Sequence, residues 1–277
     1  MRMTRRRSLP RAFTIIELLV TLTIIVMMIS VLLPAIAATR ESARRVGCIN
    51  NMRQIALALQ NYETTYHTFP PGVVNPRGPI HNTPDDLHIG WIVQLLPYLE
   101  QNGVSRAIDT EFSVYDPVNR TAAATRISSL RCSSDRSNGL VKGIAASSYA
   151  ACHHEVEAPI DVDNHGVFFL NSHISYADIT DGSSTTVLVG EKRTADLDLG
   201  WISGTNATLR NTGTAINAVK ALTTMEMAGG FGSTHPGGAN FMFGDGSVRF
   251  LHNAIPQDLY QRLGHRADGE LVGEGPY

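Results

Sequence analysis

The chain has 277 residues and a net charge of −2, so it is long enough to bury a sizeable core and has no overall positive charge for binding nucleic acid. Its 43% hydrophobic and 17% charged residues are ordinary for a globular protein and argue against a disordered one. Five arginines and no acidic residue occupy the first 12 positions. The positive-inside rule therefore predicts a cytoplasmic leader and an exported remainder, although Arg40, Arg44 and Arg45 on the opposite flank weaken the asymmetry.

An apolar segment follows the leader and contains one charge, Glu17, before Arg40. Residues 18–38 are uncharged and mostly apolar, which is enough for a helix to cross a bilayer. The segment fits a plain membrane anchor, or a signal peptide cleaved after Ala35-Ile36-Ala37. Neither explains Glu17, because a carboxylate in a membrane helix costs about 2.5–3.5 kcal/mol and therefore indicates a function.

Residues 1–17 resemble a prepilin signal, with a basic leader, a cleavage point before Phe13 and a glutamate as the fifth mature residue. Ala12 precedes the cut, where the family usually has glycine. The resemblance implies that prepilin peptidase removes residues 1–12 and methylates the new amino terminus. It also implies that Glu17 neutralises the ammonium of Phe13 on a neighbouring subunit during assembly, because opposite charges attract strongly where the dielectric is low.

Apolar residues recur at spacings of three and four beyond the membrane segment, which predicts that the helix continues to about Tyr66. This stripe consists of Val46, Ile49, Met52, Ala56, Leu59 and Tyr62. Pro34 is expected to kink the helix, and Phe69-Pro70-Pro71-Gly72 to follow its end. The expected domains are a leader (1–12), a transmembrane helix (13–38), its amphipathic continuation (39–66) and an extracytoplasmic head (67–277).

The head is expected to be mostly antiparallel β-sheet, which makes the fold α+β. Residues 73–90 are predicted as a loop, and residues 90–101 as a short buried helix broken at Pro97. The clearest strands are Val167–Leu170 and Thr186–Val189. Further predictions are a hairpin of residues 239–243 and 247–251 around an Asp-Gly turn, and a helix near residues 256–263.

His235, nine further residues and then Asp245-Gly246 resemble the prepilin-processing-associated motif. This motif closes a large bacterial family of pilin-like proteins whose function is not established. Other segments that match the family are residues 48–55, 69–72, 91–101, 132–135, 148–151 and 181–185. The resemblance implies a pilin-like fold, with the long helix packed on the head, and a place in a type II secretion or type IV pilus-like machine.

The three cysteines would lie outside the cytoplasm, where a disulfide can persist and one thiol is left over. The family resemblance favours a Cys48–Cys132 bond, because these two cysteines fall in family motifs and Cys152 does not. A Cys132–Cys152 bond and reduced thiols are the alternatives.

His235, Asp245 and Gly246 are expected to form a structural turn network, because a strand rise of about 3.3 Å per residue separates the first two along one strand. Cys152-His153-His154-Glu155 offers metal-ligand types, but consecutive residues cannot all point at one ion. The loop that begins at Asp161 starts like a calcium loop and has Ser172 where the bidentate glutamate belongs. We therefore expect no metal site and no cofactor, with calcium as the exception to test.

Three functions follow, in decreasing order of support. The first is a structural pseudopilin or minor pilin in the inner membrane, which is not an enzyme and whose partners are prepilin peptidase and other pilin-like subunits. The second is a membrane-anchored binding module that recognises its partner through residues 73–90 and 153–165. The third is a periplasmic enzyme that uses His235 and Asp245.

Overall fold

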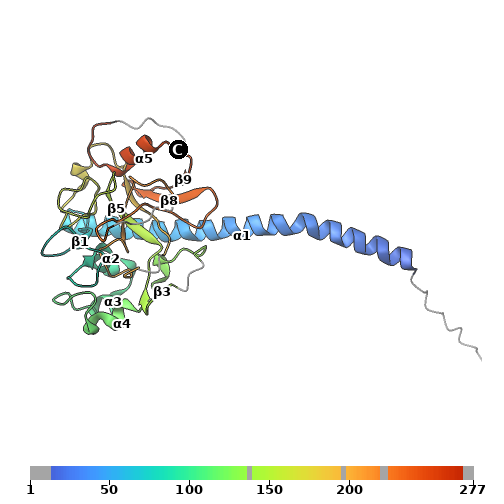
Figure 1. Cartoon of the computed structure of the whole chain (residues 1–277), viewed down its shortest axis with the longest axis horizontal. Helices are drawn as coiled ribbons and strands as arrows, with labels where there is room; N and C mark the ends of the chain where they lie inside the picture. Colours follow the sequence, from blue (N-terminus) through green and yellow to red (C-terminus); the bar gives the residue numbers. More distant parts are fainter. Residues whose placement is uncertain (1–13, 136–138, 195–197, 219–223, 271–277) are drawn as a thin grey trace, which may run out of the picture. The chain divides into compact units, whose positions relative to one another are not determined.

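The computed structural model describes residues 14–135, 139–194, 198–218 and 224–270 (Figure 1). The chain divides into two compact units, residues 1–43 and 44–277. Helix α1 (Ile15–Tyr66) begins in the first unit, continues through Pro34 and ends in the second. The long apolar N-terminal helix expected from the sequence is therefore confirmed.

The part of α1 within the second unit buries one face, which includes Met52, Ala56 and Leu59 of the predicted stripe but not Val46. Cys48, Met52, Ile55 and Leu59 are at most 1% exposed, whereas Val46 is 56% exposed. The spacing of three and four residues is correct; the face is set by Cys48, whose side chain points into the second unit to form a disulfide.

The second unit is built around a five-stranded sheet with the order β7-β5-β6-β8-β9. The strands are β5 (Tyr149–His154), β6 (Val187–Glu191), β7 (Leu209–Asn211), β8 (Gly238–Phe243) and β9 (Val248–His252). All neighbouring pairs are antiparallel except β5 and β7. The fold is α+β, as predicted, and the predicted hairpin is β8–β9.

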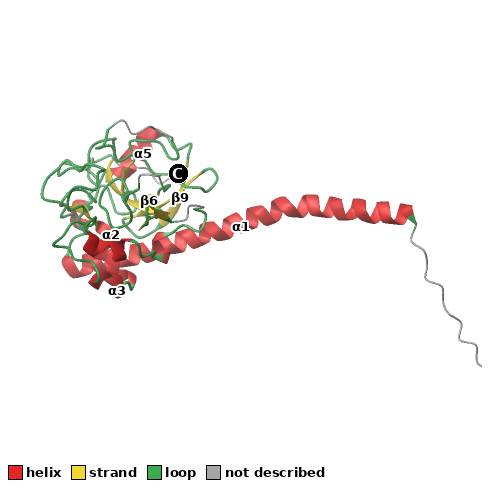
Figure 2. Cartoon of the chain, turned by 60° about the horizontal axis from the view of Figure 1, so that its bottom comes forward, coloured by secondary structure: helices red, strands yellow, loops and turns green. Residues whose placement is uncertain are grey.

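Helices cover both faces of this sheet (Figures 1 and 2). Alternate residues of a strand point to opposite faces. Tyr149 and Ala151 of β5 accordingly belong to a core that contains the buried face of α1, while Ala150 and Cys152 belong to a second core. That second core contains α5 (Gln257–Gly264), through Tyr260 and Leu263. Burial on both faces explains why β5 is buried at every position.

The remaining described chain is mostly turns and loops, with short elements between them. The strand pairs are β1 (Val73–Val74) with β2 (Ile89–Gly90), and β3 (Leu140–Val141) with β4 (Ile144–Ala145). The α-helical turns are α2 (Trp91–Leu95), α3 (Asn102–Arg106) and α4 (Arg120–Ala123). The 3-10 turns are η1 (Leu96–Leu99), η2 (Pro117–Asn119), η3 (Ser128–Leu130) and η4 (Tyr176–Asp178).

Three local predictions are corrected. The helix from residue 91 is not broken at Pro97, because it tightens into η1, whose first turn accommodates a proline that lacks an N–H. Residues 73–90 are not wholly a loop, since β1 and β2 pair across their ends. Val167–Leu170 is buried but forms no strand: Phe168 donates to Cys152 on one side, and Phe169 accepts from Val73 on the other.

Candidate functional site

Glu17, the residue expected to carry assembly, lies in the first turn of α1 and is exposed. Its Oε2 accepts hydrogen bonds from both the backbone N–H and the hydroxyl of Thr14, each at 2.9 Å. The Glu17 N–H donates in return to Thr14 Oγ1 at 3.3 Å. This is a capping box, which satisfies N–H groups that the start of a helix leaves unpaired. The two expected processing residues, Ala12 and Phe13, lie outside the described residues.

The helix that follows Glu17 exposes its apolar side chains. Within the described residues, α1 is the one helix long and apolar enough to cross a membrane, and its most apolar window has a mean hydropathy of 2.7 with none of its residues buried. The large exposed side chains include Leu18, Leu22, Ile25, Ile29 and Leu33. Such a continuous apolar surface is stable in lipid or against other apolar helices, and a single-pass anchor fits it.

Cys48 of α1 and Cys132 form a disulfide, the pair that the family resemblance favours. The bond ties α1 to the segment before β3, and it closes 84 residues of chain. Cys152 is a free, fully buried thiol. Burial raises its pKa to about 12, so the thiol is protonated at neutral pH.

His235 lies next to this disulfide. Its Nε2 is 3.4 Å from Sγ of Cys132 and 3.2 Å from Oε1 of Glu191, at the end of β6. The Glu191 carboxylate also accepts the backbone N–H of Asn240 at 2.8 Å and its amide at 3.0 Å. Arg45 on α1 reaches the same Asn240 with its Nε, at 3.4 Å. Buried polar groups are stable only when paired, and this network pairs them across α1, β6 and β8.

Asp245 and Gly246 bind different partners from His235. Asp245 Oδ1 accepts the Ser247 N–H at 2.8 Å, which closes the β8–β9 turn, and its own N–H donates to the Ser183 carbonyl at 3.0 Å. Gly246 has a φ of +80°, a conformation that glycine adopts without strain. The two halves of the motif therefore lie in two networks.

Sequence reasoning missed Glu191. The one indication in the sequence is that Glu191 directly follows the apolar residues of β6. Among the described residues, none at helical or strand spacing from Glu191 is its partner. Its partners come from positions more than 40 residues away along the chain, as the separation of 49 residues to Asn240 shows. Contacts of that range follow from the sheet order and cannot be read from local spacing.

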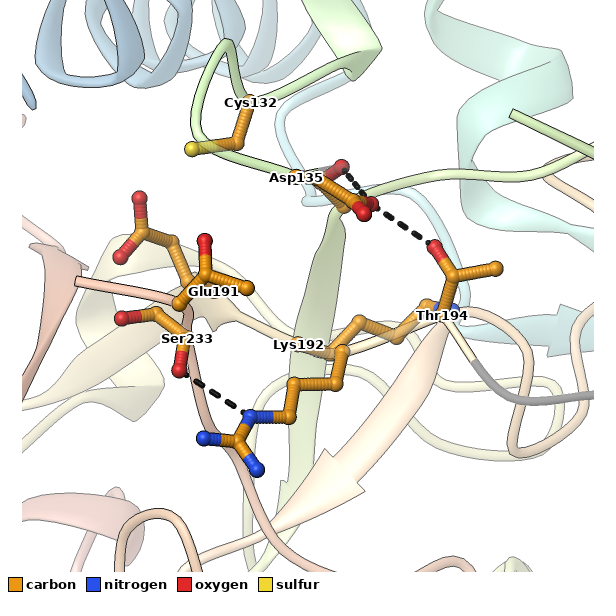
Figure 3. A pocket seen from close by; sticks show the side chains of 9 residues that line it. Cys132, Asp135, Glu191, Lys192, Thr194 and Ser233 are labelled. Carbon is orange, nitrogen blue, oxygen red and sulfur yellow. Dashed lines mark hydrogen bonds between the residues drawn. The ribbon is translucent and has the colours of Figure 1, made fainter. Parts of the chain in front are cut away.

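A cavity of about 280 Å³ lies beside His235 and the disulfide (Figure 3). It is lined by Cys132, Asp135, Ser148, Glu191, Lys192, Arg193, Thr194, Ser233 and Thr234. Asp135 Oδ2 accepts from Ser148 Oγ at 3.1 Å. It also accepts from Thr194 Oγ1 at 2.9 Å, a bond that Figure 3 shows. Burial lowers the pKa of Lys192, and the adjoining Asp198 carboxylate opposes that shift through a fully buried ion pair. Several polar groups at the cavity bind one another, since Arg193 Nε also donates to the Ser233 carbonyl at 3.1 Å.

The predicted calcium loop turns its oxygens towards its own backbone. Asp161 Oδ1 accepts the Val162 N–H at 2.8 Å, and Asn164 Oδ1 accepts the Asp161 N–H at 2.9 Å. Asn164 Oδ1 also lies 3.1 Å from Nδ1 of His153. Burial lowers the pKa of His153 to about 4, more than the Asn164 contact raises it, so this histidine is neutral at neutral pH.

No curated protein and no solved structure is significantly similar to this chain. One family, described as "Protein of unknown function (DUF1559)", matches residues 37–258. The match covers most of the chain, including α1 from before Cys48, both cysteines of the disulfide, Glu191, and the whole motif from His235 to Gly246. The chain therefore belongs to the DUF1559 family of proteins of unknown function.

Proposed function

We propose that this protein is a pilin-like structural subunit of a type II secretion or type IV pilus-like machine. Prepilin peptidase cuts before Phe13, and α1 then holds the mature protein in the inner membrane, with the amino terminus on the cytoplasmic side and the head outside. The protein acts by assembly with other pilin-like subunits, and no catalytic group, cofactor or nucleic acid belongs to this role. Association of the DUF1559 family with pilin-like and type II secretion proteins supports the proposal.

The observation that carries the proposal is the position of Glu17, the lone carboxylate at the exposed start of an apolar helix of membrane length. Both Thr14 donors bind the same oxygen, Oε2, so capping occupies one side of the carboxylate. We infer that Oε1 receives the ammonium of Phe13 from a neighbouring subunit. Pairing the two charges offsets the cost of holding each of them in lipid.

The disulfide supports an extracytoplasmic head, because such bonds persist in oxidising compartments and are rare in the cytosol. It also gives the helix mechanical continuity with the head, since Cys48 lies on α1 and Cys132 lies in the head. A force or displacement applied to α1 is thereby transmitted covalently from Cys48, within the helix, to the segment before β3. That property suits a subunit pulled from or pushed through a membrane machine.

Charge and capping can be separated with two variants. Glutamine replaces glutamate in capping boxes, so Glu17→Gln keeps the cap and removes the charge. Thr14→Ala removes the cap's hydroxyl and keeps the charge. We expect Glu17→Gln to abolish assembly while leaving membrane insertion intact, and Thr14→Ala to assemble. If Glu17→Gln assembles like the wild type, the charge-pairing role is wrong.

A membrane-anchored binding module is the second candidate, and the cavity beside His235 is the observation that favours it. Self-crosslinking discriminates the two functions. Leu57 is 60% exposed on α1, although it is apolar, and Val162 is 55% exposed in a loop of the head. Leu57→Cys should crosslink to a second copy in membranes if α1 assembles, and Val162→Cys should not. A monomeric receptor would crosslink at neither position.

A further inference from the structure

Two histidines and a glutamate converge at the end of β5. His154 is the last residue of β5, Glu155 follows it, and His165 comes from the next loop. Nδ1 of His154 lies 2.6 Å from Oε2 of Glu155, and Nδ1 of His165 lies 2.9 Å from its Oε1. The carboxylate therefore stands between two imidazole rings, with one oxygen facing each. The ring centroids of His154 and His165 are 4.6 Å apart.

Two backbone features produce this convergence. The pairing of β5 with β7 shifts register between Cys152 and His154, and such bulges redirect the side chains beside them. Gly166 donates to the His153 carbonyl at 2.9 Å, and a Cβ at Gly166 would lie 2.6 Å from the His153 backbone. Only glycine allows that approach, which brings the adjoining His165 against the end of β5.

Oε2 of Glu155 and Nδ1 of His154 face each other without a well-directed hydrogen bond between them. The buried Oε2 of Glu155 accepts no well-directed hydrogen bond among the described residues, although His154 Nδ1 is so close. In the tautomer in which Nδ1 of His154 accepts the Val156 N–H at 3.3 Å, a lone pair of Nδ1 faces a lone pair of Glu155 Oε2. His154 is only 7% exposed. A cation between the two atoms would turn this repulsion into attraction.

The spacing of the ligand atoms suits a single ion. The ligand atoms of all three side chains lie within 4.8 Å of one another. Metal–ligand bonds of about 2.0–2.2 Å at tetrahedral angles place ligand atoms roughly 3.3 Å apart, so small side-chain movements suffice.

We propose that His154, Glu155 and His165 bind a divalent transition-metal ion of the Zn²⁺ class. Two imidazoles and one carboxylate are a common zinc ligand set, whereas calcium requires six to eight oxygen ligands. The three side chains leave a fourth position to water or to a partner's side chain. His265 follows α5 and packs against His165 with the two rings tilted by 50° and their centroids 4.7 Å apart, which shields one side of the site. The ion would fasten the end of β5 to the loop around His165.

Local sequence patterns indicate only part of this site, because His154 and Glu155 belong to the run of metal-ligand types at residues 152–155 and His165 does not. Glu155 and His165 are separated by 10 residues, which is not the spacing of a helical or C-x2-C ligand pair. The sequence expectation that consecutive residues cannot share an ion holds within a strand. Here Glu155 lies just beyond β5, in a bend, and can turn back towards His154.

Calorimetric titration of the full-length protein in detergent, stripped of metal with a chelator, tests the site with ZnCl₂ as the probe. His165→Ala and Glu155→Gln remove one ligand each. The matched control is His81→Ala, because His81 belongs to another exposed His–Glu pair, 3.7 Å from Glu226. Since the His165 side chain is 47% exposed, its removal should leave the fold intact, which a thermal melt without metal checks.

We expect one saturable site in the wild type and in His81→Ala, and binding at least about 10-fold weaker in both ligand variants. Zn²⁺ should also raise the melting temperature of the wild type and not of His165→Ala. Co²⁺ should give the visible absorption of a tetrahedral site in the wild type and in His81→Ala, but not in the two ligand variants. Equal Zn²⁺ affinity in the wild type and the ligand variants, or no saturable binding in the wild type, would overturn the proposal.

Discussion

Nε2 of His235 lies 3.4 Å from Sγ of Cys132, in the disulfide that ties α1 to the head. The same nitrogen lies 3.2 Å from the carboxylate of Glu191. The histidine of the family motif thus joins the helix, the disulfide and the central sheet at one buried point. This geometry indicates that His235 stabilises the packing of these three parts, and measurements of stability test this interpretation.

His235→Ala should destabilise the head far more than Asp245→Ala. Removal of the imidazole leaves the buried Glu191 short of a partner, which costs about 1–3 kcal/mol or more. Asp245 is partly exposed, and loss of its turn bond to Ser247 should cost about 0.5–1.5 kcal/mol. Chemical unfolding can be followed by tryptophan fluorescence, because both tryptophans are fully buried. Equal losses of unfolding free energy in the two variants would argue against this stabilising role of His235.

Reduction of the disulfide should lower the free energy of unfolding by about 2–5 kcal/mol, because the bond restrains a long loop in the unfolded chain. The measurement is unfolding with and without reductant, compared with a Cys48→Ala/Cys132→Ala variant. The remaining Cys152 is not disulfide-bonded, so reductant should have no effect on that variant. A reductant effect that persists in the double variant would show a different disulfide.

Gly246→Ala should destabilise the β8–β9 hairpin by about 1–2 kcal/mol, because a residue with a Cβ is strained at a φ of +80°. Gly103→Ala is the matched control. Gly103 lies in α3 with nothing within 4 Å of an added Cβ, and alanine there should stabilise by up to about 1 kcal/mol. The two free energies of unfolding should therefore change in opposite directions. A neutral Gly246→Ala would show that the turn adopts another conformation.

His88 should make the head less stable as the pH falls below about 6.5. Burial lowers the pKa of His88 from its usual 6.5, more than the Asp86 and Asp85 carboxylates raise it. The unfolded chain then binds the proton first, so the stabilising contribution is complete above the unfolded pKa and is lost as the pH drops through the folded one. His88→Asn suits the test, because asparagine tolerates the positive φ of 46°. The variant should lose less stability than the wild type between pH 7 and pH 5, and equal losses would contradict the assignment.

The sequence predicts the elements with strong local signals. The length of α1 follows from apolar residues in membrane-length and helical spacing, and the β8–β9 hairpin follows from its Asp-Gly turn. Prediction from the sequence fails where contacts with residues distant along the chain determine the local structure. Val167–Leu170 has the composition of a strand, yet its backbone bonds go to two different neighbours and make no ladder. Val46 continues the apolar spacing but lies on the exposed side of the helix.

The candidate sites show the same division. His235 and Asp245 are found by their motif, but their partners are not, because Glu191 reaches His235 through the order of strands in the sheet. Local spacing likewise cannot bring His165 to Glu155, since a bulge in β5 and the close approach of Gly166 bring them together. Residue types therefore indicate which groups can act, and topology decides which of them meet.

The most direct test of the central claim is mass spectrometry of the amino terminus of the protein purified from its native membrane. We expect residues 1–12 to be absent and the chain to begin at an N-methylated Phe13. The same preparation of Glu17→Gln should carry the same cut, because removal of the leader precedes assembly. An intact leader, or a terminus at Ala38 left by a signal peptidase, would show that the protein is not processed as a prepilin.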